Sequence, residues 1–105
     1  MNKFNAQKTE VDSIVFHSKK EASRYVELKL LMHAKGDDKI LNIELQPKFP
    51  CVVEGKLICT YIADFIIHYA DGRVVYEDVK GMKTPVYRLK KKLVEVLYKI
   101  EIVET

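Results

Sequence analysis

Apolar and polar positions alternate along this chain with two periods, one typical of helices and one typical of strands. Residues 18–34 predict a helix because apolar side chains recur there every three positions. These side chains are Ala22, Tyr25, Leu28 and Leu31. Residues 84–99 predict a second helix, in which Thr84 is the N-cap and Pro85 occupies the first helical position. Its expected buried stripe is Leu89, Leu93 and Val96.

Between and after these helices, runs of β-branched and aromatic residues predict strands. The first strand covers residues 40–53 with interruptions at Pro47 and Pro50, since proline is tolerated only at edges and bulges. The second covers residues 57–69, the third residues 73–80 and the last residues 100–103. Residues 14–16 form a short lead-in strand, and residues 1–13 are expected to be a loose segment.

The resulting order is helix, three meandering strands, helix, strand. The last strand follows a helical crossover and is therefore expected to join the sheet in parallel. We predict an α/β (α+β) fold, a mixed sheet flanked by helices. With 105 residues, 48% of them hydrophobic, the chain can bury one core, so residues 14–105 are expected to form a single domain.

Charged residues interrupt two of the apolar strands. Asp64 lies in the second strand, and Asp78 and Lys80 lie in the third. Strand interiors are depleted in aspartate, and burying charge is costly unless the groups pair, bind a metal or do chemistry. These three residues are therefore the first candidates for a functional site.

The turn between the two strands decides whether the aspartates meet. Residues 70–72, Ala-Asp-Gly, suit a three-residue loop with glycine at the left-handed position. This loop pairs Tyr69 with Arg73 and places Asp64 directly opposite Asp78. A two-residue turn would shift the register by one position and place Asp64 beside Glu77 instead, so Glu77 is the alternative acid.

Basic residues are concentrated around the second helix, although the net charge of the chain is only +3. Five lie between residues 83 and 92, a stretch without any acid, and the first helix adds Lys19, Lys20 and Arg24. The five are Lys83, Arg88, Lys90, Lys91 and Lys92. Such a run is either a solvated helix face or a surface that follows nucleic-acid phosphates. Its position directly after Asp78 and Lys80 favours the phosphate-binding interpretation.

These patterns together resemble the PD-(D/E)XK nuclease superfamily, most closely its small phage- and prophage-encoded members. The resemblance rests on the element order and on residues 17–22, 45–49, 61–65 and 77–81, and it extends over about residues 14–103. One position departs from the pattern, because Ala63 stands where the motif's loosely kept proline precedes the aspartate. The resemblance implies an αβββαβ restriction-endonuclease-like core.

The resemblance also implies roles for individual residues. Asp64 and Asp78 would bind one or two Mg²⁺ ions, for which Mn²⁺ substitutes, and Lys80 would position the attacking water and stabilise phosphate charge. Glu21 matches the first-helix acid that completes the metal site, although the spacing from Ser18 to Glu21 also suits a capping box. Gln46 matches a glutamine near the site in related nucleases; its alternative role is a hydrogen bond at the Pro47 bulge.

The function implied is metal-dependent hydrolysis of DNA phosphodiester bonds, with a preference for DNA structure rather than sequence. Holliday-junction resolvases of phage recombination and replication fit this description and imply a homodimer bound to branched DNA. Two alternatives stay open: a flap-type or transposase-associated nuclease of the same fold, and a non-catalytic DNA-binding module. The chain offers no membrane span of about 18 apolar residues and no apolar signal region, which predicts a cytoplasmic protein, in the host cytoplasm if it is phage-encoded.

Overall fold

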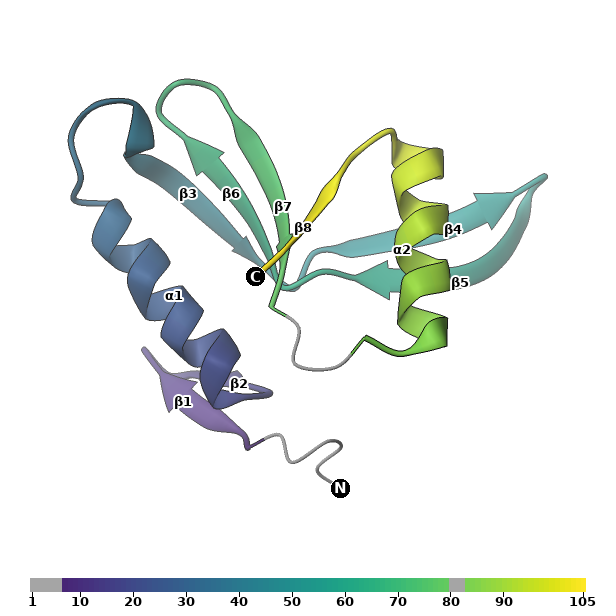
Figure 1. The fold of residues 1–105 in the computed structure, drawn as a ribbon, viewed down its shortest axis with the longest axis horizontal. Helices are drawn as coiled ribbons and strands as arrows, with labels where there is room; N and C mark the ends of the chain where they lie inside the picture. Colours follow the sequence, from purple (N-terminus) through teal and green to yellow (C-terminus); the bar gives the residue numbers. More distant parts are fainter. Residues whose placement is uncertain (1–6, 80–82) are drawn as a thin grey trace.

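The computed structural model describes residues 7–79 and 83–105 of the chain (Figure 1). Lys80, one of the predicted site residues, lies outside the described residues. The elements run in the following order: β1 (Thr9–Val11), β2 (Ile14–Phe16), α1 (Lys19–Leu31), the 3₁₀ turn η1 (Gly36–Asp38), β3 (Ile40–Leu45), β4 (Lys48–Val53), β5 (Lys56–Ile62), β6 (Phe65–Tyr69), β7 (Val74–Asp78), α2 (Pro85–Tyr98) and β8 (Ile102–Glu104).

A four-stranded mixed sheet lies at the centre of the fold, in the order β3-β6-β7-β8. The first three strands are antiparallel neighbours, and β8 pairs with β7 in parallel, as the crossover rule predicts. The helices α1 and α2 flank this sheet (Figure 1). The predicted mixed sheet with flanking helices is therefore confirmed, and the chain has an α+β fold. Among the described residues, no helix is long and apolar enough to cross a membrane.

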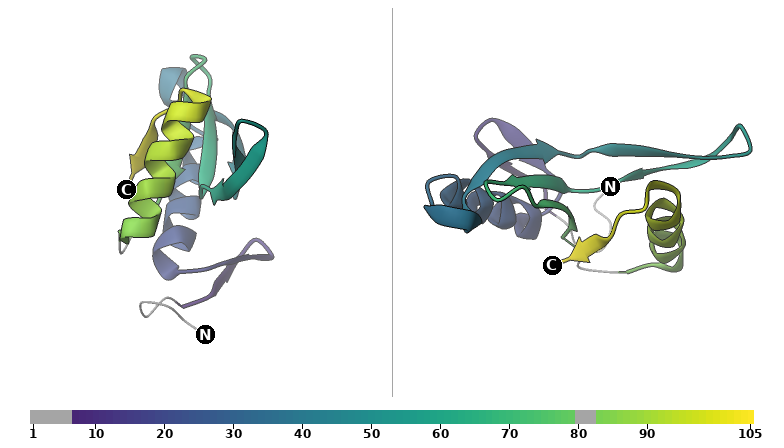
Figure 2. Two further views of the ribbon diagram at one scale, coloured as in Figure 1. Left: turned by 90° about the vertical axis from the view of Figure 1, so that its right-hand side faces the viewer. Right: turned by 90° about the horizontal axis from the view of Figure 1, so that it is seen from above.

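Two long strands expected from the sequence are each broken at the same level of the molecule. The predicted second strand breaks at Ala63 and Asp64, and the first breaks at Gln46, whose φ of 48° lies in the left-handed region. Backbone hydrogen bonds nevertheless cross the break, from Gln46 N to Asp64 O (2.9 Å) and from Ala63 N to Pro47 O (3.1 Å). The β4–β5 hairpin therefore continues the ribbon of β3 and β6 and extends as an arm beyond the central sheet (Figure 2).

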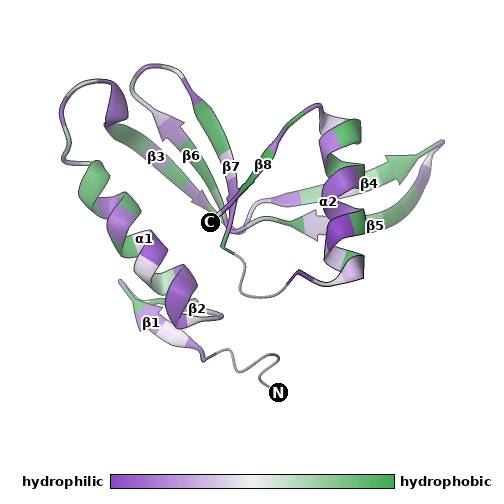
Figure 3. Cartoon of the chain, in the orientation of Figure 1, coloured by the Kyte–Doolittle hydropathy of each residue, from purple (hydrophilic) through white to green (hydrophobic). Residues whose placement is uncertain are grey.

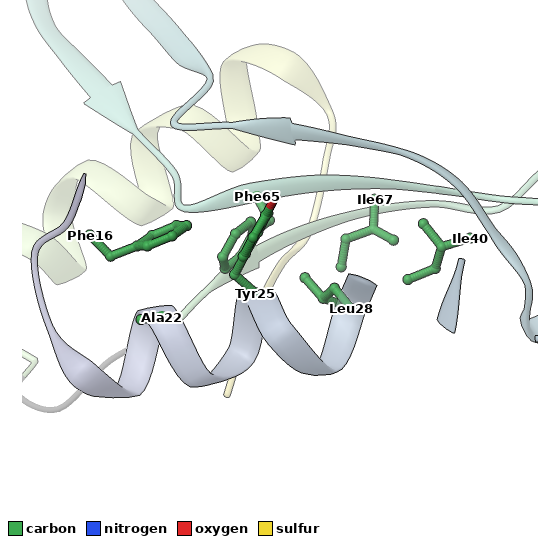
Figure 4. Packing of buried hydrophobic residues seen from close by; sticks show 7 residues of the cluster. All are labelled: Phe16, Ala22, Tyr25, Leu28, Ile40, Phe65 and Ile67. Carbon is green, nitrogen blue, oxygen red and sulfur yellow. The ribbon is translucent and has the colours of Figure 1, made fainter. Parts of the chain in front are cut away.

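Helix α1 packs on one face of the sheet as its periodicity predicts. Ser18 caps it by accepting a hydrogen bond from the Glu21 amide (3.1 Å), and the helix ends at Leu31 rather than near residue 34. Its buried side chains contact a cluster formed by residues of β2, β3 and β6 (Figure 4). The members of this cluster are Phe16, Ala22, Tyr25, Leu28, Ile40, Phe65 and Ile67.

Helix α2 covers the opposite face of β6 together with the β4–β5 hairpin, whose strands are largely hydrophobic (Figure 3). Thr84 caps it by accepting from the Tyr87 amide (3.1 Å), and Pro85 opens the helix as predicted. The predicted buried stripe is correct at Leu93, which is partly buried and packs against the residues of this face, and wrong at Leu89 and Val96, which are each 69% exposed. Apolar residues cover a wide arc of the helix, and the part that packs inward is centred on Val94, which is fully buried.

The N-terminal residues are more ordered than their composition predicts. Residues 1–13 were expected to be loose, but Thr9–Val11 forms β1 and pairs antiparallel with β2. Asp12 in the intervening turn accepts a hydrogen bond from the Tyr25 hydroxyl (3.0 Å), which ties this hairpin to α1. For residues 9–11 the prediction of a loose segment is therefore wrong, while residues 1–6 lie outside the described residues.

A buried ion pair fixes α1 to the central sheet. The Arg24 guanidinium donates to both carboxylate oxygens of Glu77, with Nε–Oε2 at 2.7 Å and Nη2–Oε1 at 2.8 Å. The Glu77 side chain is only 2% exposed, and its hydrogen bonds raise the pKa of Arg24 above its ordinary value. A bidentate pair of this kind fixes orientation as well as distance, so α1 is held at the carboxyl end of β7.

We predict that Arg24→Ala lowers the free energy of unfolding by about 3 kcal/mol, because it leaves the buried Glu77 carboxylate uncompensated. Denaturant titration of the variant measures this change. The control is Glu27→Gln, which removes the exposed partner of Arg24 on the same helix (3.1 Å) and should cost less than about 1 kcal/mol. The double variant Arg24→Met with Glu77→Leu should recover most of the loss. Equal effects of Arg24→Ala and Glu27→Gln would contradict this account.

Candidate functional site

The β6–β7 hairpin has the register that the three-residue loop predicts. Gly72 adopts a φ of 96°, and the Tyr69 amide donates to the Arg73 carbonyl (2.9 Å). Phe65 consequently pairs with Glu77, which places Asp64 opposite Asp78. The alternative register, in which Asp64 would lie beside Glu77, is wrong.

The two aspartates lie opposite each other across the β6–β7 hairpin, at the level where the predicted second strand breaks. The Asp64 amide donates to Asp78 Oδ1 (3.1 Å), and the Val79 amide donates to Asp64 Oδ2 (2.7 Å). Asp78 is fully buried, and Asp64 is partly buried. These two amide-to-carboxylate bonds are formed in addition to the backbone bond from the Asp64 amide to the Glu77 carbonyl (3.1 Å), and they hold both aspartate side chains in place.

The sheet separates these aspartates from Glu77. Successive side chains of a strand point to opposite faces, so Asp78 lies on the face covered by α2 and Glu77 on the face covered by α1. The Arg24 contact confirms the position of Glu77. Glu77, predicted as a possible site acid, is thus engaged in holding α1 and does not join the aspartate pair.

Two other predicted site residues, Glu21 and Gln46, lie on segments near the aspartate pair. Glu21 is 5% exposed and belongs to α1, on the side of the helix that carries Arg24. In Figure 1 the amino end of α1 lies toward the end of the sheet where β7 finishes. Gln46 lies beside Asp64, because the backbone amide of Gln46 donates a hydrogen bond to the backbone carbonyl of Asp64. Lys80, two residues beyond Asp78, lies outside the described residues.

A further acid at this site, Glu104, was not predicted from the sequence. The parallel pairing of β7 and β8 places Glu104 beside Asp78. Its carboxylate accepts a hydrogen bond from the Tyr87 hydroxyl (2.7 Å) and pairs with Lys83 (3.2 Å). Its position directly after the apolar residues Ile102 and Val103 could have indicated it, but only once the last strand had been placed next to β7.

Electrostatics tie Tyr87 and Glu104 to the aspartates. Burial raises the pKa of Tyr87, and the hydrogen bond to Glu104 and the negative charge of Asp78 raise it further. Tyr87 is therefore a neutral donor at physiological pH. The hydrogen bond from Tyr87 lowers the pKa of Glu104, and Lys83 lowers it further against the opposing effect of burial. Glu104 is consequently held as a carboxylate beside the fully buried Asp78.

The donor chemistry of this site fits a hard divalent cation. Among the residues that the structure describes, no group of three or more His, Cys, Asp or Glu side chains is arranged to hold a metal ion. Mg²⁺, however, is usually bound through one or two carboxylates, with waters and substrate phosphates completing its octahedron. Asp64 and Asp78 supply such a pair, and a carboxylate offers about four lone-pair sites, so an amide hydrogen bond does not exhaust its capacity.

The predicted basic surface is divided by α2. Lys83, Arg88, Lys91 and Lys92 line one pocket of about 300 Å³ together with Glu95 and Glu104. Lys90 lies on another side of the helix, toward Cys51: burial raises the pKa of the Cys51 thiol, and the charge of Lys90 opposes that shift. Lys19 and Lys20 are exposed in the first turn of α1.

The fold and site define a small α+β protein with a pair of facing aspartates at a strand break and a basic pocket beside them. The chain matches the family described as "Protein of unknown function (DUF1064)" over residues 1–103, and it belongs to that family. No curated protein and no solved structure matches it. The family description assigns no activity.

We predict that Tyr87→Phe lowers the free energy of unfolding by about 1–2 kcal/mol at neutral pH, because it removes a hydrogen bond to a carboxylate. Glu104 has a lowered pKa in the folded state, so its contribution is present above the unfolded value near 4 and is lost as the pH falls. The difference between wild type and variant should therefore shrink on acidification, as followed by thermal unfolding across pH 3–7. Tyr98→Phe is the control, because Tyr98 donates to the uncharged Pro50 carbonyl (2.6 Å). A Tyr87→Phe cost that is the same at every pH would contradict the assignment.

Proposed function

We propose that this protein is a metal-dependent DNA endonuclease of the PD-(D/E)XK type. The observation that carries the proposal is the meeting of Asp64 and Asp78 on adjacent strands, each held by an amide hydrogen bond from the other strand. Lys80 follows Asp78 at the spacing of the superfamily's acid-X-Lys motif.

The order of elements supports the same proposal. From α1 onward the chain passes through an antiparallel meander, crosses over through α2 and returns in parallel beside β7. This order supports the proposal of an αβββαβ restriction-endonuclease-like core. The aspartate pair lies at the carboxyl end of β7 and the amino end of β6.

The chain's own residues suggest how the reaction would proceed. Asp64 and Asp78 would hold Mg²⁺ or Mn²⁺, which supplies an activated water and neutralises charge on the reacting phosphate. Lys80 would orient the attacking water and stabilise the charge that develops on the phosphate oxygens. Glu21, a buried acid near the amino end of α1, is proposed as the residue that completes the metal site at the end of the sheet where β7 finishes.

The substrate is proposed to be recognised by shape. The β4–β5 arm is the main part of the chain outside the proposed nuclease core. The cations near the site are mostly lysines, which contact phosphates as point charges and carry no base specificity. A structure-selective nuclease resembling Holliday-junction resolvases fits these features.

The nuclease would act as a homodimer, and the exposed apolar side chains of α2 offer one surface on which two copies could pair. These are Val86, Leu89 and Val96, each more than 60% exposed.

Two other functions are compatible with the same fold. A flap-type or transposase-associated nuclease would share the metal site but cleave other DNA geometries. A non-catalytic DNA-binding module would keep the basic pocket without needing the aspartate pair. The observation that favours an enzyme over a module is the buried Asp78 beside Asp64, because a binding surface gains nothing from this arrangement.

We predict that Asp64→Asn, Asp78→Asn and Lys80→Ala each reduce Mg²⁺-dependent cleavage of DNA on the order of 10³-fold or more, because each removes metal binding or charge stabilisation worth several kcal/mol. Timed cleavage of linear, flap and four-way-junction DNA, with and without Mg²⁺, measures this loss. Asp37→Asn is the matched control, since it removes one carboxylate from the exposed η1 turn and should cleave at the wild-type rate.

The outcomes separate the three functions. Preferential cleavage of the junction supports the resolvase-like function, and preferential cleavage of flap or linear DNA supports another nuclease of the fold. Metal-dependent cleavage that survives Asp78→Asn would overturn the assignment of the site. DNA binding with no cleavage of any substrate, in Mg²⁺ or in Mn²⁺, would leave the binding module.

A further inference from the structure

The basic pocket between α2 and β8 has an uneven balance of charge. Four cationic side chains and two carboxylates line it. Lys83 pairs with Glu104 (3.2 Å), and Lys91 pairs with Glu95 (3.8 Å). Within the described part of the chain, no ion pair includes Arg88 or Lys92, so these two cations give the pocket its excess positive charge.

Each of the two carboxylates accepts a hydrogen bond from a neighbour other than Arg88 and Lys92. Glu95 Oε2 accepts the backbone amide of Ile102 (2.8 Å), which ties the helix to the start of β8. Glu104 accepts the Tyr87 hydroxyl. Glu104 and Glu95 therefore pair with Lys83 and Lys91, and the remaining positive charge of the pocket suits it to bind an anion.

The location of the pocket relates it to the aspartate pair. Glu104 lies at the wall of the pocket and is the β8 partner of Asp78 on β7. Neighbouring strands are about 4.8 Å apart, so the pocket begins one strand spacing from the candidate metal site and lies on the same face of the sheet. An anion bound there would stand beside a phosphate positioned at Asp64 and Asp78.

We propose that this pocket binds a single phosphate group of the DNA strand, adjacent to the phosphate at Asp64 and Asp78. This inference rests on the proposed nuclease function and assigns a second phosphate site to it. Arg88 supplies a planar guanidinium that can donate two parallel hydrogen bonds to phosphate oxygens, and Lys92 supplies a second charge one helical turn away. The group is either a backbone phosphodiester or a terminal phosphomonoester, since both present at least two non-bridging oxygens to a guanidinium.

The pocket also separates the basic residues of α2 into those that hold the phosphate and those that do not. Lys90 lies on the Cys51 side of the helix and does not line the pocket. The contiguous run of lysines in the sequence is therefore not one surface. The phosphate site consists of Arg88 and Lys92, supported by Lys83 and Lys91.

The test uses the full chain without divalent metal, so that binding is measured in the absence of cleavage. The double variant Arg88→Gln with Lys92→Gln, the pocket variant, is compared with a control double variant, Lys35→Gln with Lys56→Gln. The control removes the same amount of charge from an exposed turn and an exposed hairpin position. Affinity for a duplex is measured by fluorescence anisotropy over a range of salt concentrations. The pocket variant should bind at least about tenfold more weakly, because it loses charge-assisted hydrogen bonds. The magnitude of its salt slope should fall by about 0.9, the value for one phosphate.

Two further ligands identify the source of the phosphate. If a 5′-phosphorylated duplex binds wild type more tightly than a 5′-hydroxyl duplex does, and the pocket variant abolishes this difference, the pocket takes a terminal phosphate. Equal binding of the two duplexes by wild type, together with the loss in the pocket variant, identifies a backbone phosphate. Equal affinity losses in the pocket and control variants would overturn the inference, and so would wild-type affinity in the pocket variant.

Failure of this inference is distinguishable from failure of the proposed function. If Asp78→Asn abolishes cleavage while Arg88→Gln with Lys92→Gln binds DNA as wild type does, the phosphate pocket is wrong and the nuclease stands. If the pocket variant loses DNA binding but wild type cleaves no substrate, the phosphate pocket stands as a binding site and the nuclease function is wrong.

Discussion

The register of the β6–β7 hairpin is the constraint on which the rest of this structure depends. A three-residue loop with Gly72 in the left-handed region sets it, and Asp71 reinforces it by accepting from both the amide (2.9 Å) and the side chain (2.6 Å) of Arg73. A slip of one residue would exchange the faces of Glu77 and Asp78. Arg24 would then lose its partner, and Asp64 would lose the side chain opposite it.

The same register places different side chains on the two faces of β7. On one face Glu77 anchors α1 through a buried ion pair, and on the other Asp78 joins Asp64 and Glu104 in a polar row that crosses β6, β7 and β8. The first arrangement contributes to specifying the fold, whereas the second brings three carboxylates together at the carboxyl end of β7.

Local chemistry made several of these features predictable from the sequence. The glycine at position 72 specified the turn and so the opposition of Asp64 and Asp78, and the Thr84-Pro85 pair specified the start of α2. Features that depend on distant partners were not predictable. The Arg24–Glu77 pair joins residues 53 positions apart, and Glu104 enters the site only through parallel pairing with β7. The buried stripe of α2 was predicted correctly at Leu93 but wrongly at Leu89 and Val96, because apolar residues cover a wide arc of this helix and periodicity alone does not choose which part of the arc packs inward.

The account as a whole depends on whether the facing aspartates bind a divalent cation. Crystals of the protein grown with Mn²⁺ test this most directly, because manganese is located by its anomalous scattering. The account predicts a manganese peak about 2.1 Å from carboxylate oxygens of both Asp64 and Asp78, which is absent in Asp78→Asn. A structure at saturating Mn²⁺ with no peak between these two side chains would contradict it.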